Sequence, residues 1–503
     1  MDNNNKKEYM IKHSLILTIS AYFLRFISAI VGFATKSILG PTLTGTFSFL
    51  MIFHEYIRFL DLGIKHAVRI KIPLLTGSGE KDKVKLIKNI GFTFTLFSAL
   101  IVCFLIIPID IFIRPILNND YLFYGIIMIS FFSLLFNLIQ YYLSIFQASK
   151  KFWIVSYYNI IYAFLALFLK IGLTYFFGLY GLLTSMLIIN SLILIYFLRK
   201  DKMSFLFKWK ELFTLIKFGF PLIILQFVTR SIFSIDKLVI AKFFTFEELG
   251  FYTIAIMAHS FLYSAPGKFV TVISPFFFEK VGKDKSHMKS LNYLIKTTSI
   301  LAFFFAFLIG IFIIIYPLLV NFILPRFSPG INAAKIIIFA TFFLGIVGMS
   351  TNVILALEKQ KIWLLISVIV LITSIVLNFI FIKLGLGIEG VAFASLISLL
   401  IYTSSIIIYV LRLFEKSTNY IFKFLTYCYF PIIYTFICIK ILSFVTNNFT
   451  NSFNQADIAG FISTSTITLA FFILYLPLFY LINKKTNIIS LIINLLKKKL
   501  IRI

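Results

Sequence analysis

The sequence predicts an all-α polytopic membrane protein of about fourteen transmembrane helices. Three observations predict this class. Hydrophobic residues make up 60% of the 503 positions, whereas soluble domains contain about 45–50% apolar residues. Apolar runs of about 20 residues, the length that crosses a bilayer, recur from one end of the chain to the other. Finally, lysine and arginine gather in alternate connections between these runs.

The apolar runs are separated by short polar connections, which sets the expected order of helices. The polar N-terminus is followed by a full-length apolar run without a small-residue cleavage pattern, so this run predicts a first transmembrane helix and not a removed signal peptide. The helices are expected at 14–36, 43–63, 89–109, 122–146, 153–176, 179–198, 214–241, 250–275, 293–321, 333–356, 363–383, 389–411, 421–443 and 458–482.

The basic residues predict the orientation, because they accumulate near helix ends on the cytoplasmic side. They fill the N-terminal segment and every second connection after it, among them 65–88, 199–217 and 484–502. The other connections hold few, such as Arg114 and Arg326. Both termini are therefore expected in the cytoplasm. This topology accounts for the net charge of +28, and no nucleic-acid partner is expected.

An internal repeat divides the chain. Three pairs of residues are each 205 positions apart: Arg25 and Arg230, Gly45 and Gly250, His54 and His259. Each repeat holds six helices, so both copies have the same orientation, and the natural site lies between them near the midplane. The expected domains are an N-lobe at 1–206, a C-lobe at 207–415, and a C-terminal part at 416–503 with two extra helices and a basic amphipathic tail.

Basic residues inside the apolar runs are the candidate substrate-binding groups. A charge in hydrocarbon costs at least about 2.5–3.5 kcal/mol, so each should face a cavity or a partner. Arginine offers a planar fork that binds phosphate bidentately, while lysine acts as a point charge. Their excess over acidic groups predicts an anionic cargo, with Arg25 and Arg230 clamping a pyrophosphate. The candidates are Arg25, Arg58, Arg230, Lys237 and Lys268.

A second set of ionisable residues is expected to line the cavity or to couple transport to Na⁺ or H⁺. It comprises His54, Glu55, Asp61, Asp236 and His259. Arg58 and Asp61 are spaced i,i+3 and can also form a structural salt bridge. The two histidines are either hydrogen-bonded core residues or groups that titrate during transport.

Several classes of site are not indicated by the sequence. Cys103, Cys428 and Cys438 lie in apolar runs and are expected to be packing residues. Metal-ligand spacings and phosphate-binding glycine loops are lacking. No connection is long enough for an extramembrane catalytic domain, so an enzyme is not expected. Pro221, Pro266 and Gly267 interrupt apolar runs and are the hinge candidates.

Four segments carry a family resemblance: ILGPTLTGTFSF, FGFPLIILQFVTRSIFSIDKLVIAKFF, ELGFYTIA and GIEGVAFAS. They resemble signatures of Wzx-type polysaccharide (O-antigen) flippases of the multidrug/oligosaccharidyl-lipid/polysaccharide transporter superfamily. The resemblance implies a V-shaped fold of two lobes, alternating access, and export of undecaprenyl-pyrophosphate-linked oligosaccharide across the bacterial inner membrane. By position it also implies a cationic cavity lined by Arg25, Arg58, Arg230 and Lys268.

Three alternatives stay open at this point. A lipid II flippase shares the fourteen helices, with a lipid groove formed by the last pair. A cation-extruding multidrug antiporter would need an acidic cavity, and a membrane-embedded glycan polymerase predicts a large external loop. The expected partners are the lipid-linked oligosaccharide, membrane lipids that hold the basic tail, and polysaccharide polymerase machinery. The protein is expected to be a monomer.

Overall fold

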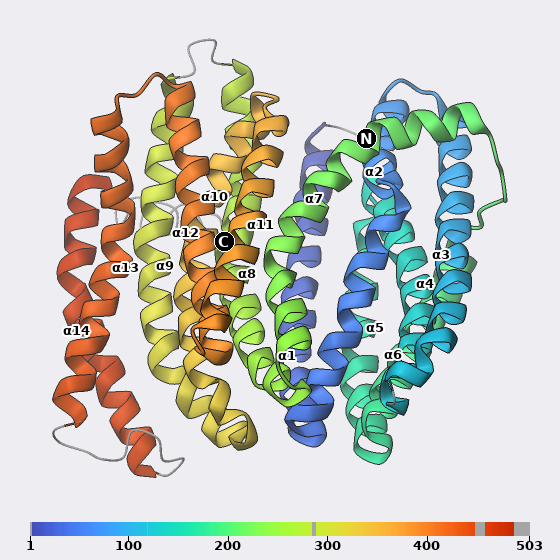
Figure 1. Ribbon diagram of the computed structural model, residues 1–503. Helices are drawn as coiled ribbons and strands as arrows, with labels where there is room; N and C mark the ends of the chain where they lie inside the picture. The colour runs from blue at the N-terminus through green and yellow to red at the C-terminus, as the bar shows by residue number, and fades with distance from the viewer. Residues whose placement is uncertain (1–2, 118, 284–287, 448–457, 487–503) are drawn as a thin grey trace. The chain divides into compact units, whose positions relative to one another are not determined.

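The computed structural model describes residues 3–117, 119–283, 288–447 and 458–486, and these residues form helices and no strands (Figure 1). Within these ranges, the side chains of Lys268 and of some other helical residues lie outside the description. The all-α class is thereby confirmed. The elements are α1 (Asn3–Ile57), η1 (Arg58–Asp61), α2 (Ile64–Gly77), α3 (Lys81–Leu117), α4 (Asp120–Ala148), α5 (Phe152–Leu165), η2 (Ala166–Lys170), α6 (Ile171–Lys200), α7 (Trp209–Phe243), α8 (Phe246–Lys283), α9 (Met288–Ile323), η3 (Pro325–Gly330), α10 (Ile331–Ala356), α11 (Gln360–Lys383), α12 (Gly387–Leu413), α13 (Thr418–Asn447) and α14 (Ile458–Thr486).

Two of the continuous helical stretches each contain two of the expected membrane crossings. Among the described residues, eleven segments are long and apolar enough to cross a membrane, and two of them, Ile16–Asp61 and Phe152–Lys200, have 46 and 49 residues. Each is interrupted by a glycine with a positive φ, Gly40 at 71° and Gly178 at 57°. This backbone region is costly for residues with a Cβ atom. The glycines therefore separate the first expected helix from the second and the fifth from the sixth.

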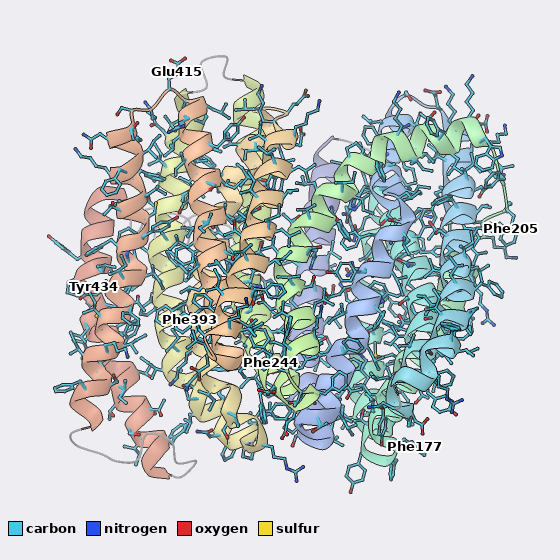
Figure 2. All side chains as sticks on the ribbon, in the orientation of Figure 1. Phe177, Phe205, Phe244, Phe393, Glu415 and Tyr434 are labelled. Carbon is cyan, nitrogen blue, oxygen red and sulfur yellow. The ribbon has the colours of Figure 1, made fainter. Side chains whose placement is uncertain are left out.

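The remaining expected crossing is α8. It is not among the apolar segments found in the described part of the chain. Many large aromatic side chains are exposed, among them Phe177 at 64% exposure (Figure 2). Such a surface suits lipid and would be an aggregation hazard in water.

Contacts divide the chain into two compact units. Unit 1 comprises residues 1–230 and 241–250, and unit 2 comprises residues 231–240 and 251–503. Helix α7 is therefore shared, with its first part grouped in unit 1 and Ser231–Ile240 in unit 2. The lobe boundaries expected at 206/207 and 415/416 rest on the sequence repeat and stay a prediction.

In unit 1, α4 is the central helix, because it packs against α1, α2, α3, α5 and α6. Tyr141, Tyr142 and Phe146 of α4 are completely buried in its core. The two tyrosine hydroxyls donate to the backbone carbonyls of Lys88 (2.7 Å) and Asp201 (3.2 Å). These bonds satisfy the buried hydroxyls and fix α4 against its neighbours.

In unit 2, α10 occupies the corresponding role. It packs against α9, α11 and α12, while α13 and α14 pack against α9 and against each other. Phe471 and Tyr475 of α14 are fully buried, and the Tyr475 hydroxyl donates to the Phe303 carbonyl of α9 at 2.8 Å. The two C-terminal helices are thus integral parts of unit 2.

Candidate functional site

Arg58 is the best-defined cation of unit 1. It opens the 3₁₀ turn η1, and its guanidinium carbon lies 5.2 Å from the centre of the Phe136 ring of α4. It makes neither an ion pair nor a hydrogen bond with any residue that the structure describes. The charges of Arg230, Glu55 and Asp61 lie within electrostatic range of it. An arginine held on an aromatic face keeps its donors available to a ligand.

The other predicted cations are placed differently. Arg230 is brought near Arg58, as just described, whereas Arg25 lies on an exposed face of α1 and is not among the charges acting on Arg58. Lys237 is 8% exposed and belongs to unit 2. The side chain of Lys268 lies outside the described residues. The clamp expected from Arg25 and Arg230 therefore stays a prediction, and the structure offers Arg58 with Arg230 instead.

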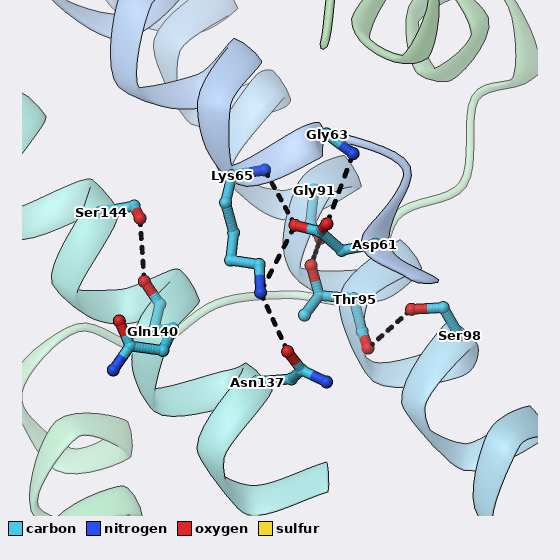
Figure 3. Close-up of polar contacts among 9 residues, drawn as sticks. All are labelled: Asp61, Gly63, Lys65, Gly91, Thr95, Ser98, Asn137, Gln140 and Ser144. Carbon is cyan, nitrogen blue, oxygen red and sulfur yellow. Dashed lines mark hydrogen bonds and ion pairs between the residues drawn. The ribbon is translucent and has the colours of Figure 1, made fainter. Parts of the chain in front are cut away.

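A polar seam joins the α1–η1–α2 segment to α4 in unit 1. We define it by three side-chain pairs that follow one another along the two elements. His54 Nδ1 lies 2.9 Å from Ser133 Oγ, Lys65 Nζ donates to Asn137 Oδ1 at 2.9 Å, and Arg69 donates to Gln147 Oε1. The middle of this seam is drawn in Figure 3.

Asp61 is bound by Lys65 and by the backbone, and not by Arg58. Its carboxylate lies 3.4 Å from Lys65 Nζ, and it accepts from the N–H groups of Gly63 (3.3 Å) and Lys65 (3.4 Å) (Figure 3). Its side chain is 2% exposed. The i,i+3 salt bridge considered for Arg58 and Asp61 is therefore replaced by an i,i+4 pair, because α2 begins at once and turns Lys65 back over the carboxylate.

The two histidines make an equivalent side-chain contact in the two repeats. His54 lies against Ser133, and His259 Nδ1 lies 2.8 Å from Thr341 Oγ1 of α10. Each hydroxyl also donates within its own helix, Ser133 to Ile129 O and Thr341 to Ile337 O, both at 2.7 Å. Since a hydroxyl has one proton, each histidine donates from Nδ1. The repeat seen in the sequence thus extends to a matching contact.

A buried carboxylate marks the corresponding region of unit 2. Asp236 is 5% exposed, and its Oδ2 accepts from the hydroxyls of Tyr252 (2.7 Å) and Ser395. Its Oδ1 has no hydrogen-bond partner among the described residues. Asn378 of α11 lies beside it. Asn378 Oδ1 and Ser374 Oγ, which lie one turn apart, are likewise buried without a partner in the described part of the chain.

This carboxylate borders a small cavity. The cavity has a volume of about 50 Å³, and its polar lining consists of Asp236, Tyr252, His259, Ser395 and Ser398. A space of about 10–15 Å³ already holds one water molecule. The cavity therefore has room for a few water molecules or a small cation next to Asp236.

A larger groove of about 370 Å³ lies between α9 and α14 of unit 2. Its lining is almost wholly apolar, with Ile311, Leu318, Phe461 and Phe472 among its residues. It contains no ionisable side chain. This groove suits a hydrocarbon chain and has no chemistry for a charged group.

Sequence reasoning missed Lys65, Asn137, Tyr252, Asn378 and Ser395 as site residues. Lys65 falls in a connection that charge pattern assigns to the cytoplasmic face, and the neutral residues look like ordinary helix positions. Among the described residues no cluster of three or more His, Cys, Asp or Glu side chains could hold a metal ion. The three cysteines are free and buried, which confirms them as packing residues. Helices α7 and α8 continue through Pro221, Pro266 and Gly267, so the hinge role of these residues stays a prediction.

Comparisons with known proteins support a transporter fold. Residues 38–327 match the family described as "Polysaccharide biosynthesis protein". No curated protein matches the chain significantly. The lipid II flippase MurJ, in an inward closed conformation, has a TM-score of 0.69 at 18% identity, covering 93% of this chain and 99% of MurJ.

Two further solved structures are similar in fold. A point mutant of the MATE transporter VcmN of Vibrio cholerae has a TM-score of 0.59 at 15% identity, covering 82% of this chain and 99% of that one. A MOP superfamily transporter of Pyrococcus furiosus has a TM-score of 0.57 at 14% identity, covering 81% and 97%. At these identities the likeness establishes the fold alone. That fold is the one of MOP superfamily transporters and flippases.

Proposed function

The chain belongs to the polysaccharide biosynthesis protein family, and from this premise we propose that it is a flippase for lipid-linked oligosaccharide. Its cargo is an oligosaccharide carried on undecaprenyl pyrophosphate. The protein moves this lipid from the cytoplasmic to the periplasmic leaflet of the bacterial inner membrane by alternating access. The product supplies surface polysaccharide assembly.

The observation that carries this proposal is the state of Arg58. It is partly buried, rests on Phe136, and is not paired with a carboxylate among the described residues. A second cation, Arg230, lies within electrostatic range. A positive charge inside a membrane protein is costly unless an anion neutralises it, and the repulsion between Arg230 and Arg58 adds to that cost at Arg58. A diphosphate supplies that charge and accepts the bidentate hydrogen bonds of arginine.

The acid beside Arg58 offers no site for a cationic cargo. Asp61 is paired with Lys65, so its carboxylate is not available to a cationic drug. The lipid II flippase is the second candidate, because MurJ matches 93% of this chain. Lipid II and the proposed cargo share the polyprenyl diphosphate, so Arg58 serves both. The family match favours the polysaccharide precursor.

The apolar groove between α9 and α14 supports a polyprenyl cargo. Its 370 Å³ of mainly apolar space suits part of a long hydrocarbon chain. The diphosphate is bound by unit 1 in this proposal, while the glycan contacts come from uncharged side chains.

Asp236 is the proposed coupling residue, with Na⁺ or H⁺ as the ion. Hard cations take oxygen ligands, and two buried oxygens lack partners among the described residues: Asp236 Oδ1, which borders the small cavity, and Oδ1 of the neighbouring Asn378. The hydroxyls of Tyr252 and Ser395 hold the other carboxylate oxygen in place. Na⁺ would bind these oxygens directly, and a proton would neutralise the carboxylate.

The test is transport by purified protein in vesicles. Fluorescent undecaprenyl-diphosphate oligosaccharide is incorporated, and its appearance in the opposite leaflet is measured by quenching. Charge-assisted hydrogen bonds contribute about 1.5–3 kcal/mol, so Arg58→Gln should lower the rate at limiting substrate by about tenfold to hundredfold. Arg58→Lys keeps the positive charge but loses the bidentate guanidinium, so its transport rate should lie between those of the wild type and Arg58→Gln. Unchanged transport in Arg58→Gln would remove the anion site, and equal transport of lipid II would favour the second candidate.

A further inference from the structure

Asp61 lies where a partner for Arg58 would be expected. Both residues belong to the 3₁₀ turn η1, and side chains three positions apart eclipse each other in a 3₁₀ helix. The charge of Asp61 acts on Arg58. An ion pair between them would occupy the guanidinium that the diphosphate needs. The turn therefore contains a built-in competitor for the ligand.

Lys65 keeps this competitor occupied. Its Nζ lies 3.4 Å from Asp61 Oδ2 and is anchored on its other side to Asn137 Oδ1 at 2.9 Å (Figure 3). The N–H groups of Gly63 and Lys65 hold the same carboxylate. Since Asn137 belongs to the central helix α4, the position of Lys65 is set by the core of unit 1.

The ion pair between Asp61 and Lys65 is buried, which raises the cost of removing either partner. The Asp61 side chain is 2% exposed and that of Lys65 is 13% exposed. Removing one partner of a buried ion pair leaves an uncompensated charge, which is strongly unfavourable. With Lys65 absent, the carboxylate would turn to the cation that remains in the same turn, Arg58.

We propose that Lys65 is a positioning residue that holds Asp61 away from Arg58 and so keeps Arg58 available to the diphosphate. The inference rests on the proposed function, because it assigns Lys65 a part in recognising that same cargo. Lys65 does not contact the ligand itself in this scheme. Its effect on binding passes entirely through Asp61.

A pair of variants separates this role from direct binding. The probe is undecaprenyl diphosphate in detergent micelles, with inorganic pyrophosphate as the soluble headgroup, and affinity is measured for the purified full-length protein. Lys65→Met should weaken binding of the probe by about tenfold, the worth of one charged contact. Adding Asp61→Asn should restore the affinity to within about threefold, because the competitor is then neutral. If Lys65 bound the diphosphate directly, the double variant would stay as weak as Lys65→Met.

Three controls keep the outcome decisive. Arg58→Gln reports on the proposed function alone: if it binds the probe as well as the wild type, the anion site fails whatever Lys65 does. Asn137→Leu removes the anchor of Lys65 and leaves both charges, so a smaller loss in the same direction is expected. If Lys65→Met does not fold, Asp61→Asn alone decides, because affinity should be kept or raised. A loss of affinity in folded Asp61→Asn, or none in folded Lys65→Met, overturns the inference.

Discussion

At the scale of the residue, the hydroxyls of Ser133 and Thr341 explain how a histidine is tolerated inside each helical unit. Each hydroxyl gives its proton to its own helix and accepts from the histidine Nδ1 of the neighbouring helix. His54 is also enclosed by the rings of Phe132 and Phe136, with centroids 4.7 and 4.8 Å away. The contacts favour the structural interpretation of His54 over titration.

Removing the Ser133 hydroxyl should therefore destabilise the fold. In Ser133→Ala the buried Nδ1–H of His54 loses its acceptor, which costs about 1–3 kcal/mol. The measurement is thermal unfolding of the detergent-solubilised protein. Ser144→Ala is the matched control on the same helix, because among the described residues Ser144 bonds only to the Gln140 carbonyl of its own helix. The change in stability for this control should stay within about 0.5 kcal/mol. Equal effects of the two substitutions would contradict the bridging role of Ser133.

The sequence identified charged residues inside the apolar runs, but it did not identify their side-chain partners. A guanidinium in an apolar run stands out because of its cost, so Arg58 and Arg230 could be selected without a structure. Lys65 also carries a positive charge, but it lies in a basic connection, where charged residues are common. Its partner Asn137 is 72 positions away, and a single Asn in a helix carries no local signal of an ion-pair anchor.

At the scale of the element, two glycine contacts bring backbones together within unit 1. A Cβ atom added at Gly45 would lie 1.7 Å from the Phe246 carbonyl oxygen, and one added at Gly250 would lie 2.0 Å from the Pro41 oxygen. A Cβ atom added at Gly63, whose φ is +83°, would likewise lie 2.3 Å from the Gly219 carbonyl oxygen. The sequence repeat identified Gly45 and Gly250 as equivalent, but only the structure shows that they contact the same pair of segments.

Substitution of Gly45 should separate α1 from the start of α8. In Gly45→Ala the new methyl group meets backbone atoms that cannot rotate away, so stability should fall by more than 1 kcal/mol, roughly the lower end of overpacking costs. The matched control is Gly172→Ala in α6. A Cβ atom added at Gly172 would have no atom of another described segment within 4 Å. That change should be neutral or stabilising by up to about 1 kcal/mol, because alanine favours helix. Thermal unfolding measures the stability of both variants. If Gly45→Ala were as stable as the wild type, the backbones of α1 and α8 would not be in close contact at Gly45.

At the scale of the whole molecule, the two units share a plan, and each carries a different candidate site. Unit 1 carries Arg58 beside Arg230, and unit 2 carries the buried Asp236. Composition predicted the surplus of cations, and the repeat predicted two similar halves. The assignment of Arg230 and Asp236 to different units could not be foreseen, because sequence position places both residues on one helix. Contacts assign the part of α7 up to Arg230 to unit 1 and Ser231–Ile240 to unit 2.

In the proposed function, α7 would connect the site for the cargo with the site for the coupling ion. Arg230 and Asp236 are six residues apart, which corresponds to about 9 Å along a helix. A displacement of the helix at Arg230 therefore also displaces Asp236.

Because coupling between two ligands is reciprocal, the affinity of the wild type for undecaprenyl diphosphate should differ at least threefold between sodium and potassium buffers. If the ion is a proton, the affinity should differ by as much between pH 6 and pH 8. Asp236→Asn should bind the probe within about threefold of the wild type and show no such dependence. If the dependence survives in Asp236→Asn, the coupling ion binds elsewhere; if binding itself is lost, Asp236 serves the cargo and the two roles are not divided between the units.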